Sequence, residues 1–341
     1  MKKINLALQG GGAHGALTWG VIDRLLEYET IKIEAISGAS AGAVNAAALA
    51  YGLHKGGREC ARETLDELWG AIVSYGAFYS PVKRSPFNAV AGDYGLDETF
   101  SYHLFDAFTR LCSPYQFNPF NINPLRDILK KLIDFDALRD CKRTMLFVAA
   151  TNVRTGKVHV FETKDMALDA ILASTCLPFL FKAVEIDGEH YWDGGYMGNP
   201  VLFPFIYSAE TRDVLIVHVN PIERKKLPVT APEIMNRINE ISFNSSLLRE
   251  LRAMSFVHKL LDEGWLKDDH ANRLRNMHVH AIRTDEFAEE LSVASKFNVG
   301  KKFIQALKLR GRNCADEWLN KNYDSLGKRS SVDIRAMFDG G

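Results

Sequence analysis

Hydrophobic and polar positions in the first fifty residues predict two strands and two helices. Residues 4–8 form a short apolar run, and residues 31–37 form a second, β-branched one. Apolar residues recur at helical spacing through 16–29, and the alanine-rich segment 41–52 predicts a helix that ends at Gly52. This order of strand, glycine loop, helix, strand, tight turn and helix is typical of a parallel α/β sheet, which binds ligands at the carboxyl ends of its strands.

Later segments extend the alternation up to residue 221. Apolar and β-branched runs predict two strands, a helix, a hairpin and a last buried strand, in the order 144–153, 157–163, 166–178, 183–196 and 213–221. Beyond residue 221 the pattern is mainly helical. It predicts a long or broken helical region over 232–266, a strand over 277–283, and a helix over 301–310 that ends at Gly311.

Two stretches depart from this regular pattern. Residues 75–124 are rich in aromatic side chains and are broken by prolines and asparagines, which indicates an insertion or a lid. Residues 322–341 are polar, and we expect a flexible tail there. The chain therefore divides into an α/β domain over 1–221, a mainly helical extension over 222–321, and this tail.

Composition removes several classes of function. The chain has 341 residues, of which 47% are hydrophobic and 25% charged, as in ordinary globular proteins. Its 42 basic residues balance its 42 acidic ones, so nothing predicts a general attraction to nucleic acid or to anionic membranes. The five scattered cysteines include no C-x-x-C pair, which argues against a zinc or redox motif and favours reduced thiols.

Neither the first residues nor any later segment resembles a targeting or membrane-spanning sequence. The short apolar stretch after Lys2 and Lys3 runs into glycines and not into a cleavage site. No apolar run approaches the ~20 residues that a membrane span requires. We therefore expect a cytoplasmic protein.

The second predicted strand runs into the pentapeptide GASAG (38–42), which matches G-x-S-x-G. In that motif a sharp strand-to-helix turn lifts the oxygen of Ser40 above the sheet, and Gly38 and Gly42 avoid clashes with nearby backbone. The start of a helix also favours negative charge at this point. A serine that merely caps the helix is the plainer interpretation. The strand before it and the helix former after it favour a nucleophile.

The first predicted strand ends at a glycine loop, GGGAHG (10–15), whose G-x-G-x-x-G spacing suits either a dinucleotide phosphate or an oxyanion. A dinucleotide site needs an acid at the end of the second strand, but the nearest acid, Glu34, lies inside that strand. If the two strands are parallel neighbours, the backbone N–H groups of Gly11, Gly12 and Ala41 can point at the oxygen of an ester attacked by the serine. The oxyanion interpretation explains both motifs, whereas the dinucleotide interpretation explains one.

A serine nucleophile needs a base. None of the ten histidines lies in a compelling motif: His14, His54, His103, His159, His190, His218, His258, His270, His278 and His280. A sharper candidate is Asp193, in YWDGGYMGNP (191–200), where a carboxylate followed by Gly194 and Gly195 lies on a tight turn after the hairpin. A simple β-turn is the plainer interpretation of Asp-Gly-Gly taken alone.

Four segments, taken in order, resemble the sequence blocks of the patatin-like phospholipase family. They are GGGAHG (10–15), GASAG (38–42), ASTCLPFLF (173–181) and DGGYMGNP (193–200), and together they span about the first three fifths of the chain. The resemblance implies a three-layer α/β/α fold with a mostly parallel central sheet. The aromatic-rich insertion and the helical C-terminal addition resemble those of extended bacterial members.

The resemblance also implies a Ser–Asp dyad in place of a catalytic triad. Ser40 becomes the nucleophile, Asp193 the base, and the glycine loop the oxyanion site. With the residues argued above, the candidate set comprises Ser40 and Asp193, the oxyanion donors Gly10, Gly11, Gly12 and Ala41, the turn glycines Gly38 and Gly42, and the supporting residues His14, Gly15, Gly194 and Gly195.

One position departs from the family pattern. The family's loop often carries arginine or lysine where this chain has His14. A neutral histidine weakens the argument from charge but leaves the backbone donors in place. Two roles stay open for His14: it begins the helix, or it tunes the site.

We therefore expect a serine acyl hydrolase of the lipase or phospholipase A type, which cleaves carboxylic esters of lipids. We expect no metal, no cofactor and no nucleic-acid partner. We do expect a transient contact with a membrane surface. The aromatic segment then builds an acyl channel or lid, or simply a second hydrophobic core. An acyltransferase, or a hydrolase of another acyl ester or thioester, would use the same residues. A non-enzymatic nucleotide-binding protein is the third hypothesis.

Overall fold

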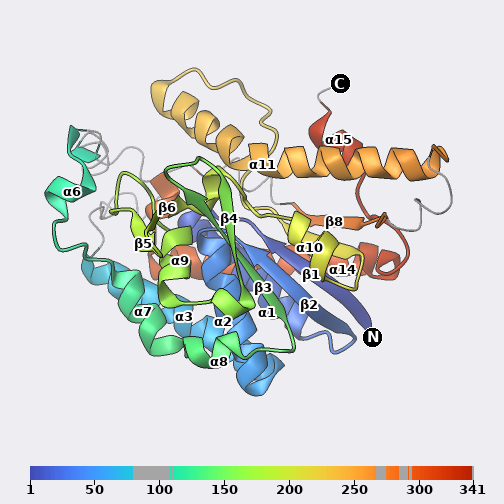
Figure 1. Cartoon of the computed structure of the whole chain (residues 1–341), viewed down its shortest axis with the longest axis horizontal. Coiled ribbons are helices and arrows are strands. Elements are labelled where there is room, and N and C mark those ends of the chain that lie inside the picture. Colours follow the sequence, from blue (N-terminus) through green and yellow to red (C-terminus); the bar gives the residue numbers. More distant parts are fainter. Residues whose placement is uncertain (80–107, 110, 266–273, 284–290, 292–293, 340–341) are drawn as a thin grey trace.

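A central sheet with helices on both faces forms the framework of the protein (Figure 1). The computed structural model describes residues 1–79, 108–109, 111–265, 274–283, 291 and 294–339. The strands lie in the order β5-β6-β3-β2-β1-β7-β8, and β4 pairs with β3. Neighbours from β3 through β2, β1 and β7 to β8 are parallel, whereas β4, β5 and β6 make antiparallel pairs. The mostly parallel α/β sheet predicted from the sequence is confirmed.

The strands match the predicted runs closely. Their bounds are β1 (Lys2–Leu8), β2 (Ile31–Gly38), β3 (Met145–Asn152), β4 (Val158–Glu162), β5 (Val184–Ile186), β6 (Glu189–Asp193), β7 (Asp213–Val217) and β8 (His278–Ile282). Along β1, Ile4, Leu6 and Leu8 face one hydrophobic core and Ala7 faces the other. A strand that is buried on both faces needs apolar residues at successive positions, which explains the continuous run in the sequence.

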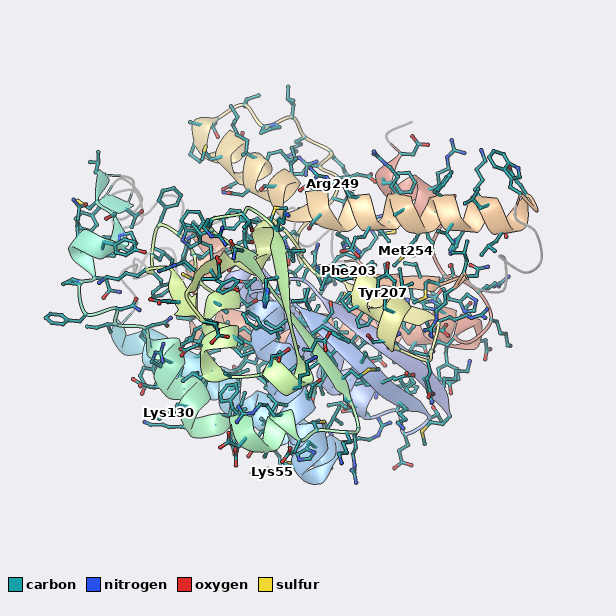
Figure 2. All side chains as sticks on the ribbon, in the orientation of Figure 1. Lys55, Lys130, Phe203, Tyr207, Arg249 and Met254 are labelled. Atoms are coloured by element: carbon teal, nitrogen blue, oxygen red, sulfur yellow. The ribbon has the colours of Figure 1, made fainter. Side chains whose placement is uncertain are left out.

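The helices form two unequal layers over the sheet. The larger core is covered by α1 (Gly15–Leu26), α2 (Ala41–Gly56), α3 (Arg58–Tyr79), α7 (Pro124–Leu132), α8 (Phe135–Arg139), α9 (Leu168–Ser174) and α14 (Lys301–Asn322). The smaller core is covered by α10 (Phe203–Ser208), α11 (Ala231–Asp262) and α15 (Ile334–Phe338). Figure 2 shows Met254 of α11 and Tyr207 of α10 on the opposite side of the molecule from Lys55 of α2 and Lys130 of α7.

Short helical turns connect these elements. They are η1 (Gly12–His14), α6 (Pro114–Phe117), η2 (Thr163–Asp165), η3 (Gly194–Tyr196), η4 (Ala294–Phe297) and η5 (Tyr323–Ser325). Two of them, η1 and η4, contact one another although they lie at opposite ends of the sequence. This contact brings the C-terminal region onto the glycine loop.

The C-terminal region shares the sheet and both cores with the rest of the chain. Strand β8 extends the sheet beside β7, and Phe303, Ile304 and Leu307 of α14 lie in the same core as β1. On the other face, Leu247 and Leu251 of α11 pack in one cluster with β7. Residues on both sides of position 221 therefore contribute to one sheet and to the same two cores, and the division at residue 221 stays a prediction.

The polar tail expected over 322–341 differs from the structure. Residues 323–325 form η5 and Ile334–Phe338 form α15, with Ile334 and Met337 buried in the smaller core. The Asp333 side chain caps α15 by accepting the backbone N–H groups of Arg335 and Ala336. A few anchoring apolar residues order this segment although its composition is polar.

Two helices continue past the glycines at which the sequence predicts them to end. Helix α2 runs beyond Gly52, and α14 beyond Gly311. A Cβ at Gly52 would lie 2.4 Å from Ala61 Cα, and one at Gly311 would lie 2.0 Å from the carbonyl oxygen of Leu17. These glycines allow helices to approach closely and do not terminate them.

The aromatic-rich insertion lies largely outside the described residues, because 80–107 and 110 are not among them. Its described ends are the last part of α3 and the segment that contains α6 and the start of α7. Within the described part of the chain, no helix is both long enough and apolar enough to cross a membrane.

Candidate active site

The glycine loop and the serine turn lie side by side at one edge of the sheet. Strands β1 and β2 are parallel neighbours, with Leu8 opposite Gly38, so both turns leave the sheet at the same end. A Cβ added to Gly10 would lie only 2.6 Å from Ser40 Cβ. The predicted adjacency of the two turns is therefore confirmed, and the first glycine is what allows their close contact.

Ser40 lies on a strained turn between β2 and α2. Its backbone has φ +53° and ψ −127°, a left-handed conformation that is rare for residues other than glycine. A Cβ at Gly38 would lie 2.5 Å from the carbonyl oxygen of Gly42, and one at Gly42 would lie 2.1 Å from that of Leu8. The two glycines therefore allow the sharp turn from β2 into α2 that the sequence predicts around Ser40.

Ser174 fixes the amide of this turn. The Ser40 N–H donates to the hydroxyl oxygen of Ser174 at 3.0 Å and to its carbonyl oxygen at 3.2 Å. Ser174 is the last residue of α9 and lies in the segment 173–181 that the sequence analysis singled out. The contact shows why that block accompanies the serine turn.

Asp193 lies fully buried at the end of β6. Its Oδ1 accepts the backbone N–H of Gly195 at 2.7 Å, whereas no donor among the described residues is in direct hydrogen-bond geometry with Oδ2. Burial raises the pKa of this carboxyl to about 6, although interaction with the nearby Ser40 hydroxyl, the Gly195 amide and the charge of Lys296 each favour the ionised form. The carboxyl beside the serine is therefore harder to ionise than an aspartate in water.

The two glycines after Asp193 make room for this turn. A Cβ at Gly194 would lie 2.0 Å from the carbonyl oxygen of Ala149, and one at Gly195 would lie 2.4 Å from the ring of Phe243 on α11. The Asp-Gly-Gly sequence therefore forms a turn and also lets this turn pack closely between β3 and α11.

The backbone amides of the glycine loop are not equivalent. The N–H of Gly10 donates to Asn199 Oδ1 at 2.6 Å, so this amide is already engaged. The amides of Gly11, Gly12 and Ala41 donate no hydrogen bond to another described residue. The candidate oxyanion donors therefore narrow to these three, and Gly10 serves to anchor the loop.

A buried amide network holds the loop in place, and the sequence analysis did not find it. Gln9 Nε2 donates to Asn244 Oδ1 at 2.9 Å, and Asn220 Nδ2 donates to the carbonyl oxygen of Gly10 at 2.8 Å. Asn199, Gln9, Asn220 and Asn244 are all buried. Asn199 lies in the segment 193–200 that the sequence analysis singled out, but Asn220 and Asn244 lie in segments without any motif.

His14 and Gly15 have packing roles. His14 is buried, and its Nε2 lies 2.7 Å from the hydroxyl oxygen of Ser295 in η4. Burial and the charge of Lys296 lower its pKa to about 3, so the ring is neutral. A Cβ at Gly15 would lie 2.8 Å from Ala41 Cβ, so this glycine lets α1 and α2 begin close together.

A cavity of about 340 Å³ lies beside Ser40. Its wall is largely apolar and includes Val44, Trp69, Ile72, Leu125, Ile128 and Leu177. Among the described residues that line it, Lys296 alone carries a charge. An apolar cavity with few polar groups at one end suits a ligand with a hydrocarbon chain and one reacting polar group.

Comparison with known proteins agrees with the four sequence blocks. A family model described as patatin-like phospholipase matches residues 6–206. Among solved structures, the chain is similar to VipD from Legionella pneumophila, with 18% identity and a TM-score of 0.45 over 94% of this chain and 67% of that one. No curated protein matches the chain by sequence.

Proposed function

Because the chain belongs to the patatin-like phospholipase family, we propose that it is a serine hydrolase that cleaves carboxylic ester bonds of lipids through a Ser40–Asp193 dyad. Membership of the family implies lipid acyl hydrolysis as the class of reaction. The observation that carries the dyad is the strained Ser40 turn, which lies beside both the buried carboxyl of Asp193 and the apolar cavity. Among the described residues, no hydrogen bond joins a histidine to Ser40, whereas the Asp193 carboxyl interacts with the Ser40 hydroxyl, which supports the carboxylate as the base.

Acylation begins with Asp193 in its ionised form. As Ser40 Oγ attacks the ester carbonyl carbon, the carboxylate takes the hydroxyl proton. The carbonyl oxygen becomes an oxyanion, and the amides of Gly11, Gly12 and Ala41 donate to it. When the intermediate collapses, Asp193 returns the proton to the departing alcohol, leaving an acyl ester on Ser40.

Deacylation repeats these steps with water as the nucleophile. Asp193 takes a proton from water as its oxygen attacks the acyl carbon, and the same amides hold the second oxyanion. Collapse releases the fatty acid, and the proton returns to Ser40 Oγ. Fixed amide donors do not reorganise during the reaction, which is why the anchored loop matters.

The apolar cavity binds the acyl chain in this proposal. Its volume of about 340 Å³ is at the lower end of the range for ligand pockets and suits one chain. The proposed location is the cytoplasm, with transient contact at a membrane surface where lipids reside. Three side chains at helical spacing on the first half of α11, Ile234, Ile238 and Ile241, are exposed and support such a contact.

The dyad predicts the effect of single substitutions. Ser40→Ala and Asp193→Asn should each lower kcat/KM by about 10⁴-fold, because they remove the nucleophile and the base. Fatty-acid release from a mixed lipid pool, analysed by mass spectrometry, measures this loss. Labelling of wild type by a fluorophosphonate at Ser40 supplies a second readout that does not require the natural lipid.

Matched controls separate chemistry from folding. Ser74→Ala and Asp127→Asn change exposed residues of the same types and should leave activity unchanged. If Asp193→Asn retains full activity while a histidine-to-alanine variant loses it, the dyad is incorrect.

The wild-type pH profile tests the assignment of the base. Since the base acts as a carboxylate, kcat/KM should rise with pH along an acidic limb whose midpoint lies near pH 6, the pKa of Asp193. An activity that does not change between pH 4.5 and 7.5 would contradict this role for Asp193.

A further inference from the structure

The glycine loop itself carries no positive charge, although an oxyanion forms beside it in the proposed reaction. The titratable side chain of the loop is His14, whose buried ring is neutral and whose Nε2 is in contact with Ser295. Its ring therefore serves as an anchor for η4. Any positive charge beside the oxyanion therefore comes from outside residues 10–15.

Lys296 brings a charge to this place from the other end of the chain. It follows Ser295 directly, so the His14–Ser295 contact fixes where its backbone lies. The carbonyl oxygen of Lys296 would be 2.6 Å from a Cβ at Gly12, which has φ +59°. Glycine at position 12 is thus required both for backbone conformation and for this close approach.

The ammonium group is tied to the loop through one amide side chain. Lys296 Nζ donates to Asn220 Oδ1 at 2.8 Å, and Asn220 Nδ2 donates to the carbonyl oxygen of Gly10 at 2.8 Å. Asn220 is buried, and Lys296 lines the cavity together with Ser40, Gly12 and Ala41. The charge, the nucleophile and two of the candidate oxyanion donors therefore line the same cavity.

Lys296 lies among several charged groups, and each of them acts on its charge. Glu240 of α11 is paired with Arg224 and Arg237, so its charge is already balanced. Burial lowers the pKa of Lys296 to about 8, opposed by Glu240 and Asp193 and reinforced by Arg224. The remaining titratable groups that interact with Asp193 are Cys176 and Tyr196, and both are neutral because their pKa values are raised to about 12.

We propose that Lys296 is a positioning residue that supplies the positive charge of the oxyanion site, holding Asp193 ionised and the glycine loop in register through Asn220. The inference rests on the proposed hydrolase function. It assigns part of the active site to a residue 90 positions beyond the family-matched segment, which ends at residue 206. A protonated Lys296 and an ionised Asp193 together define the active form.

This arrangement predicts a bell-shaped pH profile for kcat/KM. The acidic limb follows Asp193, near pH 6, and the alkaline limb follows Lys296, near pH 8. Lys296→Met should lower kcat/KM by about 10- to 100-fold, remove the alkaline limb, and move the acidic midpoint upward by about one pH unit. Lys296→Arg keeps the charge, so its activity should stay within about threefold of wild type while its alkaline limb moves above pH 9.

The test compares pH profiles of wild type, Lys296→Met, Lys296→Arg and the exposed control Lys302→Met, whose profile should match wild type. The rate of fluorophosphonate labelling at Ser40 is measured beside hydrolysis of a short-chain ester. If Lys296→Met superimposes on wild type, or if Lys296→Arg falls as far as Lys296→Met, the proposal is overturned. If wild-type Ser40 neither labels nor hydrolyses the ester, the proposed function fails as well, which distinguishes the two failures.

Discussion

The glycine loop and serine turn, within residues 10–42, differ sharply from the C-terminal segment 294–339 in how they serve the site. The first region carries its role in short local patterns, and the structure places both turns where those patterns predict. The second contains no recognisable motif, yet it brings Lys296 to the cavity and α14 to the core. Local motifs predict the shape of the backbone, whereas the position of the Lys296 charge beside that backbone depends on packing between distant segments.

The strongest way to break this comparison is to remove the C-terminal region. A chain of residues 1–221 should lack a cooperative unfolding transition, because it loses β8 beside β7 and exposes the core that α11 and α14 cover. Each large apolar side chain left exposed forfeits about 1.5–3 kcal/mol, and several together exceed the usual 5–15 kcal/mol of total stability. Circular dichroism with thermal unfolding measures the result. A fragment that melts cooperatively would show that residues 1–221 form an independent domain.

The second prediction concerns how far the buried carboxyl of Asp193 lowers the free energy of unfolding. Asp193 has a pKa of about 6 in the fold against 3.8 for an aspartate in water, so the folded state prefers the protonated carboxyl. This preference costs nothing below about pH 4, grows between pH 4 and 6, and reaches roughly 3 kcal/mol above that range. Asp193→Asn should therefore gain stability over wild type as pH rises through this window.

Urea unfolding at pH 4 and pH 8 measures this gain. The exposed Asp127→Asn variant controls for a general effect of charge removal and should show no such pH dependence. An equal effect of Asp193→Asn at both pH values would mean that the carboxyl is not shifted in the fold.

A smaller effect tests the glycines that bring the two regions together. Gly311→Ala should destabilise the protein by about 2 kcal/mol, because its Cβ would lie 2.0 Å from the carbonyl oxygen of Leu17 on α1. Gly70→Ala makes the same change inside α3, where a Cβ would meet no described atom from outside its own helix within 4 Å, and should stabilise by about 0.5–1 kcal/mol. Thermal unfolding of the two variants compares them directly. Equal and stabilising effects would contradict close packing of α14 on α1.

Four glycines show which steric roles a sequence pattern can predict and which it cannot. At Gly38 and Gly42 the expected reason for glycine is the observed one, since the steric conflict lies within the same turn or against the adjacent strand. At Gly52 and Gly311 the sequence predicts helix ends, but the helices continue. The conflict there is with a different helix, and periodicity within one segment contains no information about it.

By itself, the sequence predicted the alternation of strands and helices and the two glycine turns, and its resemblance to a family implied the nucleophile and the base. The predicted strands and turns depend on the local sterics of glycine and on the apolar runs of buried strands, and both can be recognised in consecutive residues. Tertiary structure alone decided that Asn199 engages the Gly10 amide, that His14 meets Ser295 from 281 positions away, and that Lys296 lines the cavity. Hydrogen bonds and charges act through space, so a partner contributed by a distant segment leaves no local pattern to find.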